Sequence, residues 1–135
     1  MPQQLLFVDD EPFVLEAFRR TLETYDAPWE MTFFESPHEA WRRLVAEPVD
    51  VVISDFSMPG MNGWHLADEI RDRWPHLRVG LMTGWGARIE PHEVQAHHVD
   101  FLITKPFSLD EILEALESAA RTQCGFFSRS ARYFP

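Results

Sequence analysis

The chain has 135 residues, of which 45% are hydrophobic, and it carries a formal net charge of −10. This length corresponds to about one domain with a proper buried core, and the hydrophobic content is ordinary for a globular protein. The negative charge argues against binding of nucleic acid by this domain, because such binding depends on positive charge facing the phosphates.

Membrane association and export are also not expected. No apolar stretch approaches the roughly 20 residues of a membrane span, and the N-terminus lacks the basic start and apolar middle of a signal peptide. Cys124 is the single cysteine, so no intrachain disulfide can form. Such a chain suits the reducing cytoplasm, which is the predicted location.

Five short apolar runs with strand character alternate with amphipathic helical stretches. The strands are expected at residues 3–8, 29–35, 51–53 with an end at Asp55, 78–82 and 101–104. Helices are expected to begin at Pro12, at the Ser36 capping box, after the Pro/Gly loop that follows Asp55, at Glu90–Pro91 and at the Ser108 capping box. Their predicted inward faces are Val14, Ala17, Phe18 and Thr21; Ala40, Trp41, Leu44 and Val45; Leu66, Ala67, Ile70 and Trp74; and Leu109, Ile112, Leu113 and Leu116.

This alternation predicts an α/β fold, with a doubly wound parallel sheet, helices on both faces and right-handed crossovers. Periodicity alone leaves the strand order open. The carboxyl ends of parallel strands share one edge of the sheet, where such folds place their sites. The polar residues at these ends are Asp9, Asp10, Asp55, Thr83 and Lys105. The sequence therefore predicts one functional site built from distant segments.

Three carboxylates gathered at one point repel each other, at a cost on the order of 3 kcal/mol per pair at about 5 Å and an effective dielectric near 20. A cation, protonation or both must offset this repulsion. Two adjacent acids and a third from another strand suit Mg²⁺, which prefers carboxylate, phosphoryl and water oxygens. With the Lys105 ammonium and the Thr83 hydroxyl, the set forms a receptor for a phosphoryl group, and a carboxylate can itself attack phosphorus.

Four motifs carry a resemblance to a known family. FVDDEP (7–12) contains the acidic pair, ISDFSMPGMNG (53–63) an acceptor loop, LMTGWG (81–86) a hydroxyl, and TKPF (104–107) a lysine–proline pair. In this order and spacing, over residues 3 to about 120, they resemble the receiver domain of two-component response regulators. Each motif is weak by itself, whereas four in register are very specific.

The resemblance implies a flavodoxin-like (βα)5 fold with strand order 2-1-3-4-5. It also implies transfer of a phosphoryl group to Asp55 from the phosphohistidine of a sensor histidine kinase or of a histidine phosphotransfer protein. Thr83 and Lys105 would then hold the phosphoryl oxygens. The chain would be a signalling switch with self-catalysed phosphotransfer and dephosphorylation, and not a metabolic enzyme.

For Mg²⁺, the resemblance implies direct binding by Asp10, Asp55 and the backbone carbonyl of Ser57, with Asp9 acting mostly through water. A downstream protein target, or an output domain that this chain does not include, would read the switch. Family members often form homodimers through the fourth helix, fifth strand and fifth helix, and the sequence leaves this open.

One position departs from the family pattern. The family often has Tyr or Phe three residues before the lysine, where this chain has Leu102, with Phe101 one position earlier. A one-residue offset in a strand points to the opposite face. Either the strand carries a bulge, or switching through an aromatic ring and Thr83 is absent or altered, and the second is favoured. Trp85 lies two residues after Thr83. Its side chain either covers the site in part or only packs against its neighbours.

Residues 1–120 form the expected receiver domain, and residues 121–135 a C-terminal tail or linker stump. The tail contains three arginines and no acids, which leaves a charge of about −13 on residues 1–120. Four aromatic residues lie among these arginines. Disorder and docking on this domain or on a partner are both compatible with this composition.

Two other functions fit parts of the pattern. A phosphohydrolase of the haloacid-dehalogenase type needs a second aspartate two residues after the nucleophile, and Ser57 stands there instead. A pseudo-receiver binds a partner without phosphorylation, but such domains usually lose the acid pair, the acceptor or the lysine, and none is missing here. Dependence of partner binding on Asp55 would separate this alternative from a phosphorylation switch.

Overall fold

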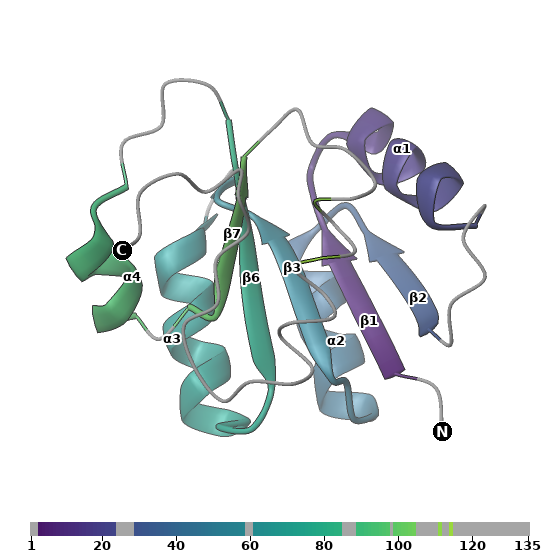
Figure 1. The fold of residues 1–135 in the computed structure, drawn as a ribbon. Helices are drawn as coiled ribbons and strands as arrows, with labels where there is room; N and C mark the ends of the chain where they lie inside the picture. The colour runs from purple at the N-terminus through teal and green to yellow at the C-terminus, as the bar shows by residue number, and fades with distance from the viewer. Residues whose placement is uncertain are drawn as a thin grey trace.

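The computed structural model describes residues 3–23, 29–58, 61–84, 89–97, 99–104, 111 and 114. Strands and helices alternate along this part of the chain, except that β3 is followed by two further short strands (Figure 1). In order they are β1 (Gln3–Val8), α1 (Pro12–Glu23), β2 (Trp29–Phe34), α2 (Pro37–Ala46), β3 (Val51–Asp55), β4 (Ser57–Met58), β5 (Met61–Asn62), α3 (Gly63–Arg73), β6 (Arg78–Thr83), α4 (Pro91–Ala96) and β7 (Phe101–Thr104). The predicted inward face of the last helix, which is Leu109, Ile112, Leu113 and Leu116, lies outside the described residues.

Five of the strands form one parallel sheet in the order β2-β1-β3-β6-β7. This confirms the order 2-1-3-4-5, because β6 and β7 are the fourth and fifth strands of the sheet along the chain. The strands β4 and β5 were not predicted, and they pair antiparallel in the loop that follows Asp55. Each has only two residues, which is too short for a periodic signal.

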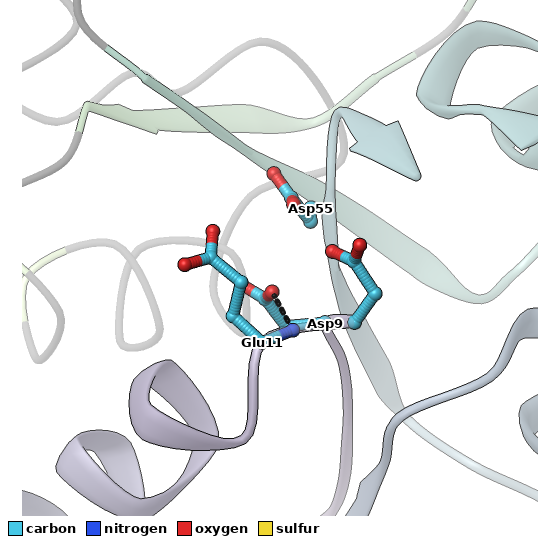
Figure 2. Close-up of side chains that lie close together, drawn as sticks. Asp9, Glu11 and Asp55 are labelled. Atoms are coloured by element: carbon cyan, nitrogen blue, oxygen red, sulfur yellow. Dashed lines mark hydrogen bonds between the residues drawn. The ribbon is translucent and has the colours of Figure 1, made fainter. Parts of the chain in front are cut away.

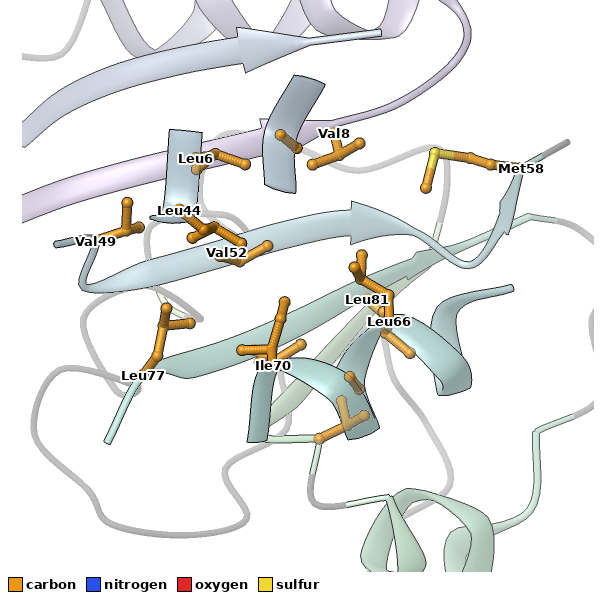
Figure 3. Packing of buried hydrophobic residues seen from close by; sticks show 14 of the residues in the cluster. Leu6, Val8, Leu44, Val49, Val52, Met58, Leu66, Ile70, Leu77 and Leu81 are labelled. Atoms are coloured by element: carbon orange, nitrogen blue, oxygen red, sulfur yellow. The ribbon is translucent and has the colours of Figure 1, made fainter. Parts of the chain in front are cut away.

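The sheet is covered on both faces, and the side chains of each strand alternate between two cores. Figure 1 shows α1 on one side of the sheet and α2 and α3 on the other. The core under α2, α3 and α4 includes Leu6, Val8, Leu44, Val52, Leu66, Ile70 and Leu81 (Figure 3). All five residues of β3 are buried, as expected for the central strand of a parallel sheet.

Four of the predicted helix starts are confirmed, because α1 begins at Pro12, α2 after Ser36, α3 after the Pro/Gly loop and α4 at Pro91, while the fifth, at Ser108, lies outside the described residues. The starts of α2 and α4 are capped by side chains. Ser36 caps α2, and its hydroxyl accepts a hydrogen bond from the N–H of His38 at 3.2 Å. At the start of α4 the Glu93 carboxylate accepts a hydrogen bond from the N–H of Glu90 at 3.1 Å. None of the described helices is both long and apolar enough to span a membrane.

Two predicted inward faces are partly wrong. The buried residues of α1 are Leu15, Phe18 and Leu22. Ala17 is exposed, because this stripe, spaced by three and four residues, is rotated from the predicted one. In α2, Val45 is 54% exposed, since it stands one position, or about 100°, beyond the buried Leu44. The face of α3 is confirmed, with Leu66, Ala67 and Ile70 buried.

The pairing of β7 shows whether this strand carries a bulge that could bring Phe101 to the position of Leu102. Residues 101–104 pair with residues 80–83 of β6 one by one, without a bulge. Leu102 packs in the core with α2, α3 and α4, whereas Phe101 packs in the core with α1. A Cβ at Gly80 would lie 2.1 Å from the Phe101 ring. Phe101 therefore fills the space above a glycine and does not replace an aromatic residue at position 102.

Two aspartates join strands at the amino edge of the sheet. Asp50 precedes β3, and its carboxylate accepts the N–H of Gln4 at 2.7 Å while its own N–H donates to the Gln4 carbonyl at 2.9 Å. Asp100 precedes β7 and makes the same two contacts with Val79, both at 2.8 Å. Each aspartate therefore links two neighbouring strands through its side chain and its main chain.

The stability of the fold should carry a pH dependence from Asp100. Burial raises the pKa of this carboxyl above 3.8, and the Val79 N–H and nearby arginines offset only part of the effect. With a raised folded-state pKa, the stabilisation is complete below the unfolded pKa and is lost as pH rises through the folded pKa. The free energy of unfolding of the wild type, relative to Asp100→Asn, should therefore fall as pH rises from about 4 and then level off.

Urea unfolding of both proteins across the weakly acidic range measures this difference. The asparagine variant is a suitable reference, because its side-chain oxygen can still accept the hydrogen bond from Val79. A difference that stays constant, or that grows with pH, would contradict the expected effect of burial.

Candidate functional site

Four acidic side chains meet where β1 and β3 end. The register of these strands places Val8 opposite Ser54, and the residues that follow them are Asp9 and Asp55. One carboxylate oxygen from each of Asp9, Asp10, Glu11 and Asp55 lies within 4.8 Å of the others. Figure 2 shows three of these side chains together at the ends of the two strands. The structure thus brings together the three acids that the sequence analysis placed at this edge.

The four acids differ in exposure. Asp9 is fully buried and Asp55 is 7% exposed, whereas Asp10 and Glu11 are exposed. A carboxylate oxygen of Asp9 accepts the N–H of Glu11 at 2.9 Å, which is the dashed line in Figure 2. This hydrogen bond orients the buried Asp9 carboxylate, so the two exposed acids form the solvent side of the cluster.

The donor set suits a hard divalent cation. It offers only carboxylate oxygens, from two strand ends, and Mg²⁺ prefers such ligands together with water. Carboxylates about 5 Å apart repel each other by on the order of 3 kcal/mol per pair at an effective dielectric near 20, which a divalent cation would offset. Glu11 was not predicted as a ligand, although it continues the same acidic run in the sequence.

Thr83 lies at the same edge of the sheet. It is the last residue of β6, it is 5% exposed, and it follows Met82, which pairs with Asp55. In β7 its partner is Thr104, and Lys105 is the next residue in the sequence. The end of β6 thus carries the Thr83 hydroxyl beside the end of β3, which carries Asp55.

Other predicted residues are only partly described. Ser57 begins β4, so its backbone lies two residues beyond Asp55, while its side chain is outside the described part of the structure. Lys105, Trp85 and the tail at 121–135 lie outside the described residues altogether.

The residue after Asp55 is fixed between two neighbours. The Phe56 N–H donates to the Met82 carbonyl at 2.8 Å, and the Phe56 carbonyl accepts the N–H of Gly63 at 2.6 Å. A Cβ on Gly63 would lie 3.0 Å from both the Phe56 Cα and a Leu81 methyl group. This close approach means that α3 begins in direct contact with the residue that follows β3.

A groove of about 580 Å³ begins beside the acidic run, between α1, the end of β2 and the start of α2. It is lined by Pro12, Phe13, Leu15, Glu16, Arg19, Phe33, Phe34, Glu35 and Glu39. Phe13 is 86% exposed and lies two residues after Glu11. An aromatic side chain exposed to this degree beside a site suits contact with a protein partner.

Comparison with known proteins identifies the family. The family model of the response regulator receiver domain matches residues 5–117. The response regulator protein FleR of Pseudomonas aeruginosa is 34% identical over 123 residues, which cover 91% of this chain and 26% of FleR. The DNA-binding transcriptional regulator NtrC of Salmonella typhimurium is 34% identical over 115 residues, covering 83% of this chain and 24% of NtrC. The chain spans about a quarter of the length of these relatives.

Solved structures share the fold. A response regulator receiver domain protein from Clostridium thermocellum has a TM-score of 0.79 at 26% identity, with 88% of this chain and 94% of that chain covered. The chemotaxis response regulator CheY4 of Vibrio cholerae has a TM-score of 0.77 at 24% identity, with coverages of 88% and 99%. These structures share the fold of this chain, and the family match over most of the sequence shows that the chain belongs to the response regulator receiver domains.

Proposed function

We propose that this chain is a phosphorylation-activated switch whose phosphoacceptor is Asp55. Membership of the receiver family supports a signalling role rather than a metabolic one. The observation that carries the proposal is the meeting of Asp55, at the end of the buried strand β3, with the three acids that follow β1. Because Asp55 is the last residue of β3, we propose that a phosphodonor reaches it from the carboxyl edge of the sheet.

In the proposed reaction a carboxylate oxygen of Asp55 attacks the phosphorus of a phosphohistidine. The new O–P bond forms an acyl phosphate while the N–P bond breaks, and the leaving imidazole nitrogen takes up a proton from solvent. The Thr83 hydroxyl and the Lys105 ammonium are proposed to hold the transferred oxygens. A hydrogen-bond donor and a positive charge stabilise the negative charge that spreads over these oxygens during transfer.

Asp10, Asp55 and the backbone carbonyl of Ser57 are proposed to hold Mg²⁺ directly, with Asp9 acting mostly through water. The burial of Asp9 and its hydrogen bond with the Glu11 N–H support the indirect role. The exposure of Asp10 leaves its carboxylate accessible to an ion that arrives from solvent. When bound, Mg²⁺ supplies charge neutralisation and orients phosphoryl oxygens.

The proposed phosphodonor is a sensor histidine kinase or a histidine phosphotransfer protein. Phe13 and the groove beside it offer such a partner an apolar contact within two residues of the acids. The signal is proposed to pass to a downstream protein or an output region, since the chain matches only about a quarter of relatives such as NtrC. Residues 1–120 are assigned to the receiver and residues 121–135 to a tail or linker.

Incubation with Mg²⁺ and acetyl phosphate is expected to add the mass of one phosphoryl group to the wild type and none to Asp55→Asn. The amide of asparagine keeps the shape of the side chain but lacks the nucleophilic carboxylate oxygen. Chelation of Mg²⁺ should abolish the adduct. Intact-protein mass spectrometry measures all three results.

Asp50→Asn is the matched control, because Asp50 lies at the amino edge of the sheet, and it should keep the adduct. An adduct on Asp55→Asn would place the acceptor elsewhere. A wild type that gains no mass and does not bind beryllofluoride would favour a pseudo-receiver, which binds its partner without phosphorylation.

A further inference from the structure

Three rings connect the end of β3 to the end of α4. Phe56, next to Asp55, packs edge-on against Trp64 of α3, with ring centres 5.2 Å apart and an interplanar angle of 79°. Trp64 in turn stacks on the imidazole of His97, with centres 4.8 Å apart and an angle of 17°. His97 follows α4 directly, so this ring series runs from the proposed phosphoacceptor through α3 to α4.

His97 makes two further contacts, one through its ring and one through its main chain. Nδ1 of His97 lies 2.8 Å from the carboxylate of Asp68, one turn beyond Trp64 on α3. The main-chain N–H of His97 donates to the Glu93 carbonyl at 3.0 Å, which ties the backbone of this residue to the last turn of α4. α4 has only six residues, and among its described side chains Val94 is the one buried in the core. The stack on Trp64 and the contact with Asp68 therefore attach the end of α4 to α3, in addition to the packing of Val94.

The first ring has little freedom to move by itself. Phe56 is bonded through its backbone to Met82 on one side and to Gly63 on the other. The 3.0 Å approach of a Cβ at Gly63 to the Phe56 Cα leaves no space between this residue and α3. In such close packing a displacement of the backbone after Asp55 shifts the start of α3, where Trp64 is the next residue.

The described part of β7 offers no second aromatic route. Leu102 is fully buried on the α3 and α4 side of the sheet and is aliphatic. The ring of Phe101 lies on the α1 side, in the space above Gly80. Within residues 99–104, no aromatic side chain therefore faces α4.

We propose that the series Phe56–Trp64–His97 couples the phosphorylation state of Asp55 to the attachment of α4. The inference rests on the proposed function, because it describes how the modification of Asp55 is read out. The contacts described above hold α4 against α3. A phosphoryl group on Asp55 displaces the Phe56 backbone, and this displacement weakens the Trp64–His97 stack and loosens α4. The modification thus acts by shifting a local equilibrium between a held and a released helix.

Hydrogen exchange of the α4 amides, measured with and without Mg²⁺ and beryllofluoride, tests this coupling. In the wild type the activator should accelerate exchange across Pro91–Ala96. Trp64→Leu should show fast exchange already without the activator, and a response at least about 5-fold smaller, the low end of usual coupling. His97→Gln should behave in the same way, and because His97 is only partly buried this variant also serves if Trp64→Leu folds poorly.

Trp41→Leu is the matched control. Trp41 packs against the same core and contacts Trp74, but it is not part of the ring series. Its α4 response should equal that of the wild type, and both variants of the series should still gain the phosphoryl mass with acetyl phosphate. Equal responses in all four proteins, or an equal loss in Trp41→Leu and Trp64→Leu, would overturn the coupling. A wild type without an adduct would remove the proposed function itself, and the coupling with it.

Discussion

Gly80→Ala is expected to lower the free energy of unfolding by about 3 kcal/mol, the upper end of the usual cost of overpacking a core. The added Cβ would lie 2.1 and 2.2 Å from two carbons of the Phe101 ring. Phe101 is fully buried and is bounded by the core under α1, so the ring cannot swing into solvent. The clash must therefore be relieved by a shift of β6 against β7, which distorts the edge that carries Thr83.

Urea unfolding measures the loss, and Gly84→Ala is the control. Gly84 lies four residues later, and a Cβ there would meet nothing within 4 Å. The double variant Gly80→Ala with Phe101→Leu should be less destabilised than the sum of the single changes, because the smaller side chain makes room for the methyl group. Equal stability of Gly80→Ala and Gly84→Ala would show that the Phe101 ring adapts at no cost.

Asp10→Asn is expected to weaken Mg²⁺ binding by at least about 100-fold, since changes to groups that merely orient metal ligands already cost about 10–100-fold. The same substitution should raise the thermal midpoint without Mg²⁺, because it removes one of four like charges within 4.8 Å. With saturating Mg²⁺ the order should reverse, because the wild type gains more stability from the bound ion than a variant that binds it more weakly.

Calorimetric titration measures the affinity for Mg²⁺. Thermal unfolding with and without Mg²⁺ shows whether the order of the two thermal midpoints reverses. Asp72→Asn is the control, because it removes the same charge from an exposed position on α3. It should bind Mg²⁺ as the wild type does. If Mg²⁺ raised the midpoint of Asp10→Asn as much as that of the wild type, Asp10 would not be a ligand.

The elements of the fold could be predicted largely from local pattern. The ends of β1 and β7 agree with the structure to the residue, because short apolar runs stop at polar or turn-forming residues. The buried faces of the helices were harder to predict than the strands. Ala17 fits an apolar stripe by composition, but its small side chain has little influence on which face of α1 is turned toward the core. Burial of Leu15 and Leu22 removes far more apolar surface from water.

The acidic part of the site was predictable for a geometric reason. Parallel strands end at one edge, so Asp9 and Asp55 must approach if both end buried strands of one sheet. The order of the strands came from the family resemblance and not from periodicity. Contacts such as Trp64 with His97 could not be predicted, because they depend on how α3 and α4 are placed, and neither sequence segment carries a signal for the other.

The aspartates that precede β3 and β7 have a consequence for the design of parallel sheets. A strand buried on both faces is apolar along its whole length, so hydrophobicity does little to distinguish one alignment with its neighbour from an alignment shifted by two residues. Asp50 and Asp100 each accept one specific main-chain N–H, from Gln4 and Val79. A shifted alignment would leave these carboxylates without that donor. An acid placed just before a strand therefore favours one register, and the same device could be used in the design of an all-apolar parallel sheet.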